Sequence, residues 1–127
     1  MPQIEKYPAH AVDTYTAEGA ITQWACVTIG TADPQVKLPT AADLGGLGFA
    51  MAAAATTEQV QIAGPGCCSR AIASAAIAAG DYLAIAGTTG KVKTVTTADT
   101  FIVGRALTAA AADGDTVWVR VMDVNNT

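Results

Sequence analysis

The sequence predicts a mostly-β domain, a small barrel or a sandwich built from two similar halves, preceded by an extended N-terminal arm. Two observations support this prediction. Short apolar segments with alternating polarity are separated by turns that contain glycine and aspartate. The second half of the chain also repeats the residue pattern of the first half.

The clearest strand signals lie in the second half of the chain. Side chains alternate between the two faces of a strand, so a strand after the turn at residues 79–81 places Leu83 and Ile85 on one face. The last predicted strand alternates in the same way, with one face formed by Val117, Val119 and Val121 and the other by Trp118 and Arg120. These segments indicate a structural scaffold and contain no obvious catalytic group.

A shift of 56 positions places the first half of the chain on the second. The matched pairs include Ile21 and Ile77, Lys37 and Lys93, Asp43 and Asp99, and Gly48 and Gly104. With one extra residue, Val60 and Ile62 also fall on Val117 and Val119. A unit that occurs twice predicts two similar β-units folded onto each other, residues 21–63 and 77–121, within one domain at 21–127.

Turn residues divide the two units internally and from each other. Asp33–Pro34 and Gly87–Gly90 are expected to form the equivalent first turns, and Gly64–Gly66 to separate the units. Residues 68–79 are ambiguous, since their alanines favour a helix whereas the alternation of Cys68, Arg70 and Ile72 favours a strand. The repeat decides for a strand.

Residues 1–20 show neither a period of 2 nor one of 3.6, and they are assigned to the arm. The segment is either a frayed terminus or an arm that orders on a partner. Tyr7, His10 and Tyr15 are the candidate contacts in the second case. Deletion of residues 1–19 is then expected to leave the fold intact.

Composition excludes several classes of function. The net charge is −4 with only 7 Lys and Arg, too few cations for nucleic acid or an anionic membrane surface. No apolar run has the length of a membrane span, and no secretory signal is visible, so a protein made in a cytoplasm is expected. A core rich in alanine buries little area per residue, which favours an oligomer.

The residues also argue against catalysis, metals and cofactors. Cys26, Cys67 and Cys68 have no metal-ligand spacing and are expected to be reduced thiols. The only histidine, His10, lies in the arm, where a nucleophile would depend on a mobile base. Residues 87–91 have two residues between the glycines where a phosphate-binding loop has four. We therefore expect no enzyme, no metal site and no cofactor.

Several large side chains are expected to lie on the surface. If Val27 and Ile29 face the core, then Cys26 faces outward together with three aromatic residues, Trp24, Tyr82 and Trp118. Loops cover these residues, or they form an interface in which Arg105 and Arg120 participate, because aromatic and arginine side chains anchor buried contacts.

Four segments in order resemble the capsid cement, or head decoration, proteins of tailed bacteriophages. They are the Gly-Asp turn into a strand at 79–83, Gly-Lys-Val at 90–92, Val-Gly-Arg-Ala-Leu at 103–107, and the Ala-rich loop into a Val-rich strand at 110–119. The first half fits the pattern more loosely, so the resemblance covers roughly residues 21–121.

The resemblance implies a non-enzymatic virion protein, a small β-barrel or β-tulip and a homotrimer, on the exterior of the capsid. Its partner is then the major capsid protein, and it stabilises the expanded head by bridging capsid subunits. The candidate capsid or subunit contacts are Tyr7, His10, Tyr15, Trp24, Tyr82, Arg105, Trp118 and Arg120. The alternative is a small β-type binding module that stacks a sugar or peptide on its outward aromatic residues.

Overall fold

A computed structural model describes residues 12–42 and 44–125, and this part of the chain consists of strands and turns without helices. It contains no helix of the length and hydrophobicity that crossing a membrane requires. The strands are β1 (Val12–Ala17), β2 (Cys26–Ile29), β3 (Gln35–Lys37), β4 (Gly48–Ala50), β5 (Gln59–Ala63), β6 (Cys68–Ile72), β7 (Tyr82–Ile85), β8 (Val92–Thr94), β9 (Phe101–Ala106) and β10 (Thr116–Asn125).

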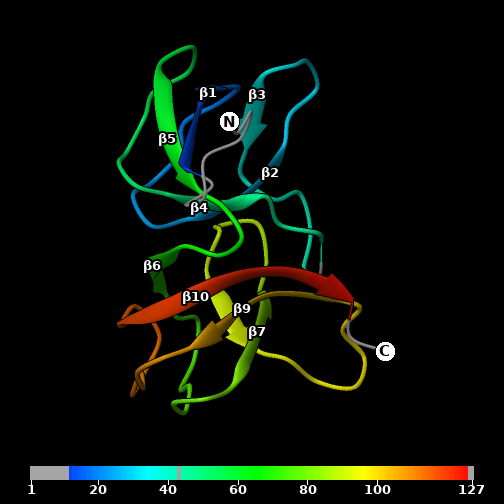
Figure 1. The fold of residues 1–127 in the computed structure, drawn as a ribbon, viewed down its shortest axis with the longest axis vertical. Helices are drawn as coiled ribbons and strands as arrows, with labels where there is room; N and C mark the ends of the chain where they lie inside the picture. Colours follow the sequence, from blue (N-terminus) through cyan, green and yellow to red (C-terminus); the bar gives the residue numbers. More distant parts are fainter. Residues whose placement is uncertain (1–11, 43, 126–127) are drawn as a thin grey trace, which may run out of the picture.

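The strands form two units of the same topology, which lie one above the other in Figure 1. In the first, the order β1-β3-β2-β4-β5 closes into a barrel, because β1 pairs with both β3 and β5. The second unit is a five-stranded sheet with the order β6-β10-β9-β7-β8. Its strands have the same neighbours as in the first unit, since β6 to β10 take the places of β1 to β5. The prediction of an all-β fold made from two similar units is confirmed, and the choice left open between barrel and sandwich falls to the barrel.

The repeat extends to individual backbone pairs. Parallel pairing of Ala17 with Val36 recurs between Ala73 and Val92. The antiparallel bridges between Ile21 and Ala54 and between Ile77 and Ala110 also correspond. All of these positions differ by 56 residues, as the sequence predicts.

The extra residue of the second unit is Ala111. Glu58 accepts a hydrogen bond from the backbone N–H of Ala55 at 2.7 Å, and Asp115 accepts the matching bond from Ala112 at 3.1 Å. Ala55 and Ala112 are 57 residues apart, whereas Ala54 and Ala110, the bridge residues just before them, are 56 apart. The carboxylate of Asp115 accepts a second bond, from the inserted N–H of Ala111 at 3.0 Å, so the turn absorbs the insertion.

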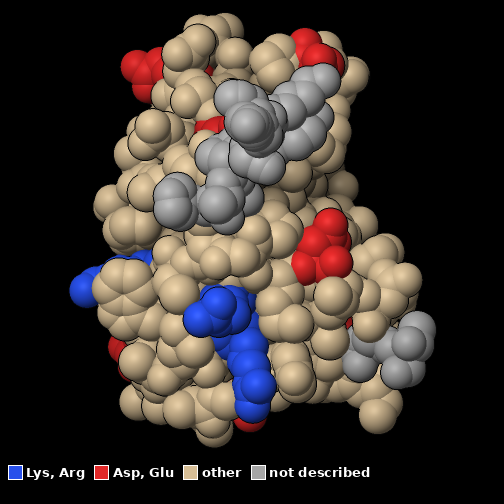
Figure 2. All heavy atoms as spheres, viewed as in Figure 1, with Lys and Arg blue, Asp and Glu red and all other residues tan. Residues whose placement is uncertain are grey.

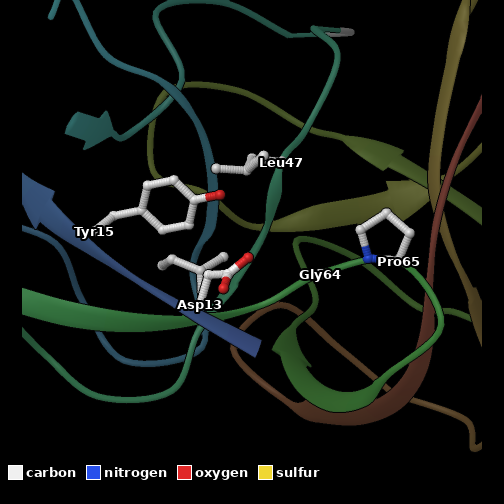
Figure 3. A pocket seen from close by; sticks show the side chains of 6 residues that line it. Asp13, Tyr15, Leu47, Gly64 and Pro65 are labelled. Carbon is white, nitrogen blue, oxygen red and sulfur yellow. The ribbon is translucent and has the colours of Figure 1, made fainter. Parts of the chain in front are cut away.

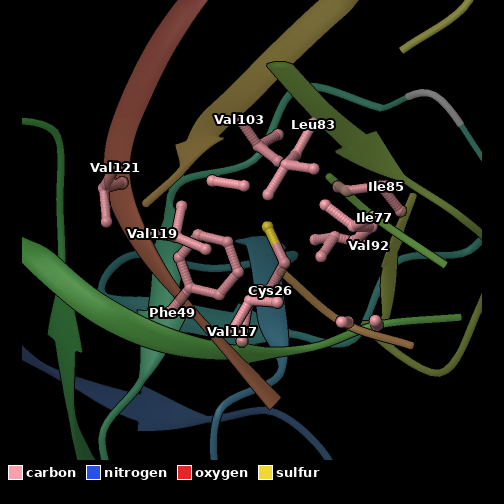
Figure 4. Packing of buried hydrophobic residues seen from close by; sticks show 14 residues of the cluster. Cys26, Phe49, Ile77, Leu83, Ile85, Val92, Val103, Val117, Val119 and Val121 are labelled. Atoms are coloured by element: carbon pink, nitrogen blue, oxygen red, sulfur yellow. The ribbon is translucent and has the colours of Figure 1, made fainter. Parts of the chain in front are cut away.

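Each unit has its own apolar core, and the two cores meet. The first core is enclosed by the first unit, with Val27, Val36, Ala50 and Ile62 among its buried residues. The second core is built around buried isoleucine, leucine and valine side chains, and the ring of Phe49 and the thiol of Cys26 from the first unit lie among them (Figure 4). Strands β2 and β4 therefore contribute one face to each core.

Part of the predicted arm belongs to the first barrel. Residues 12–17 form β1, which pairs with β5 from Val12 to Thr16, and the side chain of Ala17 is fully buried. The extended arm predicted for residues 1–20 is therefore wrong from Val12 onward, and residues 1–11 lie outside the described residues. The sequence did not indicate this strand because four of its six residues are Asp, Thr or Tyr, which leaves no clear alternation of apolar and polar residues.

Two predictions of burial in β2 are also wrong. Cys26 is fully buried instead of facing outward, because its side of the strand is covered by the second unit. Ile29 is 62% exposed, although it shares a face with buried Val27, because it is the last residue of β2 and the other described residues leave that end of the strand uncovered.

Residues 68–72 form strand β6, which confirms the preference for a strand in this segment. Gly64–Gly66 lie between β5 and β6, as predicted for the break between the units. The first turns of the units also correspond, since the N–H of Gly30 donates to Gln35 and that of Ala86 donates to Lys91.

Candidate interaction surface

The outer face of the second sheet carries two rows of side chains that lie opposite one another across its strands. The first row consists of Cys68 on β6, Arg120 on β10, Arg105 on β9 and Tyr82 on β7. The second row consists of Arg70 on β6, Trp118 on β10 and Leu107 just after β9. We call these seven residues the aromatic–arginine face.

Each row contains an arginine stacked on an aromatic ring. The guanidinium carbon of Arg70 lies 5.0 Å from the ring centroid of Trp118, and that of Arg105 lies 5.2 Å from the ring of Tyr82. The Nε–H of Arg105 also donates to the carbonyl of Gly80 at 3.1 Å, which fixes the guanidinium over the ring. Such cation–π pairs hold both partners in place on an exposed surface.

The aromatic–arginine face is exposed to solvent. Tyr82 is 42% exposed, Trp118 44% and Leu107 45%. The three arginines are exposed as well. In the view of Figure 2, cations gather over the lower half of the molecule, where Figure 1 places β9 and β10. A cationic, aromatic patch on a chain of net charge −4 is a candidate contact for another macromolecule.

The structure brings four of the eight predicted contact residues together on this face, namely Tyr82, Arg105, Trp118 and Arg120. Arg70 and Leu107 belong to it too, and the sequence reasoning missed them. The alternation of residues 68–72 could have identified Arg70, but its pairing with Trp118 depends on β6 lying beside β10.

The other predicted contact residues lie elsewhere. Trp24 is half-buried in the turn before β2, with φ at 69°, and its N–H donates to the carbonyl of Ala50 at 2.7 Å. Tyr15 is half-buried on β1. Tyr7 and His10 lie outside the described residues.

A hollow of about 80 Å³ lies at the open end of the first barrel (Figure 3). It is lined by Asp13, Tyr15, Leu47, Ile62, Gly64 and Pro65. Sites for small organic ligands usually measure roughly 300–1,000 Å³. The hollow is therefore too small to enclose a sugar or a peptide.

The described residues offer little for metal binding or thiol chemistry. Nowhere in residues 12–42 and 44–125 do three His, Cys, Asp or Glu side chains gather closely enough to hold a metal ion. The three cysteines are free thiols, and burial raises the pKa of Cys26 to about 12. A thiol with that pKa stays protonated at neutral pH and is a poor nucleophile.

Comparisons with known proteins identify the family and the fold of this chain. The family model described as phage cement protein matches residues 7–121. Among solved structures, the head fiber gp8.5 N base of bacteriophage phi29 is similar in fold, with a TM-score of 0.69 over 91% of this chain and 97% of that chain, at 17% sequence identity. None of the curated proteins matches the chain. Because the family model spans most of the sequence, the chain belongs to the phage cement protein family and is a structural protein of the phage capsid.

Proposed function

We propose that this protein binds the outer surface of an assembled phage head and stabilises the expanded shell by bridging neighbouring copies of the major capsid protein. Membership of the phage cement family is the observation that supports this function most directly. A closed barrel packed on a second five-stranded sheet, with no catalytic constellation among the described residues, suits a protein whose task is to hold other subunits together.

The second row of the aromatic–arginine face is the proposed capsid contact. Trp118 and Arg70 are stacked on each other, and Leu107 adds apolar surface beside them. Tryptophan and arginine are the residue types that most often dominate the energy of an interface. The cationic edge of this row fits an acidic surface on the shell.

Bridging follows from several weak contacts acting together. An oligomer, the trimer implied by the family resemblance, places several second rows on neighbouring capsid subunits at once, so its overall affinity exceeds that of one contact. If those contacts exist only in the expanded shell, binding shifts the equilibrium of the shell toward that state.

Co-sedimentation with heads that lack the protein tests this function. We expect saturable pelleting with expanded heads, at a fixed ratio to the major capsid protein, and none with immature shells. Trp118→Ala is expected to weaken pelleting by roughly tenfold or more. Met51→Ala, which changes the residue equivalent to Leu107 in the first unit, is the matched control and leaves pelleting unchanged. Absence of pelleting with either shell would refute the proposed function.

The candidate capsid contacts in the N-terminal segment, Tyr7 and His10, call for a second test with the same assay. Deletion of residues 1–19 removes β1 and opens the barrel, so the deletion must end at residue 11. We expect the protein lacking residues 1–11 to keep its fold and to lose shell binding if Tyr7 and His10 contact the capsid. Unchanged pelleting of this variant would exclude that contact and leave the second row as the binding surface.

A further inference from the structure

The two units use corresponding surfaces differently. The first row of the second unit has a counterpart in the first unit, formed by the residues that pair in the same register on β1, β5, β4 and β2. These residues are Val12, Ala63, Phe49 and Cys26, and they correspond to Cys68, Arg120, Arg105 and Tyr82. One row is almost entirely apolar, and the other contains two arginines and a tyrosine.

Within the chain, the apolar row covers one end of the second unit. We call this end the mouth of the unit, and its lining includes Ala71, Val103, Val119 and Val121. Phe49 and Cys26 are fully buried there, and Ala63 is 2% exposed. Figure 4 shows the ring of Phe49 beside Val119, in the core of the second unit. The N–H of Cys26 also donates to the carbonyl of Gly90 in that unit at 2.9 Å.

Among the residues that the structure describes, none fills the corresponding mouth of the first unit. The hollow in Figure 3 is lined by Tyr15, Leu47, Ile62 and Gly64, which correspond to Ala71, Val103, Val119 and Val121 around the buried row. Ile29 gives the clearest comparison. It is 62% exposed at the end of β2, whereas its counterpart Ile85, at the end of β7, is completely buried in the second core.

We propose that two copies of this chain associate head to tail, with the first row of one copy packed into the open mouth of the first unit of the other. The contact repeats between chains the one that the two units already make within a chain. It deepens the proposed function, because it supplies the oligomer on which bridging rests, but its test needs no capsid.

Charge complementarity supports a second copy as the occupant of the mouth. Asp13 lies in the hollow at the position that Ser69 has in the second unit. Arg105 has the position of Phe49, the residue that fills the closed mouth. The incoming row therefore brings a guanidinium to a mouth that carries a carboxylate, where a bidentate pair can form.

The geometry of this contact restricts the assembly. It joins two different surfaces, so it is heterologous, and such contacts produce closed rings or open filaments. A ring of three copies is the form compatible with the trimer of the proposed function. In that ring, the contact between neighbouring chains has the same arrangement as the contact between the two units of each chain.

Sedimentation velocity of the full chain without capsids tests the contact. We expect reversible self-association that weakens by roughly tenfold or more in Arg105→Asp and in Asp13→Arg. The double variant that carries both changes restores the opposite charges and recovers association. Arg70→Asp is the matched control with the same charge change. It lies in the second row, whose first-unit counterparts Thr14, Gln61 and Met51 are exposed, and it leaves association unchanged.

Thermal unfolding checks that each variant is folded. If Asp13→Arg fails to fold, the milder pair Asp13→Asn and Arg105→Gln takes its place, and each must weaken association. The proposal is overturned if the single variants associate like the unchanged protein, or if the folded double variant shows no recovery.

Other occupants of the mouth give different results. A full chain that stays monomeric, but associates once residues 1–11 are deleted, would show that its own N-terminal segment fills the mouth, and this overturns the proposal. A monomeric protein that loses shell pelleting in Arg105→Asp would assign the row to the capsid and overturn the head-to-tail contact, leaving the proposed function intact. Association without shell pelleting would instead support the contact and refute the proposed function alone.

Discussion

Phe49 and Arg105 occupy the same position in the two units and opposite environments. Each pairs with the equivalent residue of the neighbouring strand, Phe49 with Ala63 on β5 and Arg105 with Arg120 on β10. Phe49 is fully buried in the core of the other unit, whereas Arg105 lies on the surface over Tyr82. One repeat position thus holds the chain together in one unit and faces solvent in the other.

Replacement of Phe49 by alanine is expected to destabilise the protein by about 3–5 kcal/mol, because it leaves a cavity where the two cores meet. Urea denaturation measures the loss. Met51→Ala, two residues further along and 38% exposed, is the control and costs less than about 1 kcal/mol. Equal effects of the two changes would contradict the burial of Phe49 between the units.

Thr57 and Gly114 are equivalent turn residues with positive φ, at 72° and 93°. Their N–H groups donate to Ala17 and Ala73, each at 2.8 Å. A side chain in this left-handed conformation costs about 1–2 kcal/mol, and alanine recovers up to about 1 kcal/mol by restricting the unfolded chain. We expect Gly114→Ala to destabilise the fold by about 1 kcal/mol and Thr57→Gly to be neutral or stabilising.

Gly87→Ala provides the control for this pair. A Cβ at either Gly87 or Gly114 meets no atom within 4 Å, and only Gly114 has a positive φ. Thermal unfolding should therefore show Gly87→Ala at least as stable as the unchanged protein. A loss of stability equal to that of Gly114→Ala would show that backbone conformation is not the cause.

Asp99 makes the stability of the second unit depend on pH. Burial raises the pKa of its carboxyl, but the backbone N–H of Thr96 at 2.8 Å and the ammonium of Lys93 at 3.2 Å outweigh burial and hold the pKa below its ordinary value of 3.8. Because the pKa is lower in the folded state, this stabilisation is present above pH 3.8 and is lost as the pH falls through the lowered pKa.

We therefore expect Asp99→Asn to lower the melting temperature at pH 7. The difference in melting temperature between this variant and the unchanged protein should become smaller as the pH falls below 3.8. Asp113→Asn removes the partner of Lys91 from an ion pair that is largely exposed, so it should change stability by less than about 1 kcal/mol. A difference in melting temperature between Asp99→Asn and the unchanged protein that stays constant down to acid pH would contradict the lowered pKa of Asp99.

The three thiols should react in order of their exposure. Cys68 is exposed, Cys67 is buried with its pKa raised by burial, and Cys26 is fully buried with its pKa raised to about 12. With iodoacetamide at pH 8, we expect fast labelling of Cys68, slow labelling of Cys67, and labelling of Cys26 only on unfolding. Cys68→Ser should remove the fast phase. Rapid labelling of Cys26 in the folded protein would show that the two units separate.

The sequence by itself determined the class of fold and its twofold repeat. Alternating residues such as Val117 and Val119, together with glycine turns, specify strands through local geometry. The matching of Ile21 with Ile77 required only the comparison of the chain with itself. The outward orientation of Tyr82 and Trp118 was also predictable, because they alternate with residues that face the core.

Only the tertiary structure decided which outward faces stay exposed. Cys26 and Tyr82 have the same local pattern and the same place in the repeat, yet one is fully buried and the other is 42% exposed. For Ile29 and Ile85 the difference is reversed, since the residue of the first unit is exposed and that of the second unit is buried. The reason is that burial here depends on packing between the two units, which is a contact between residues far apart in the chain. A local pattern selects the face of a strand, but it does not specify what covers that face.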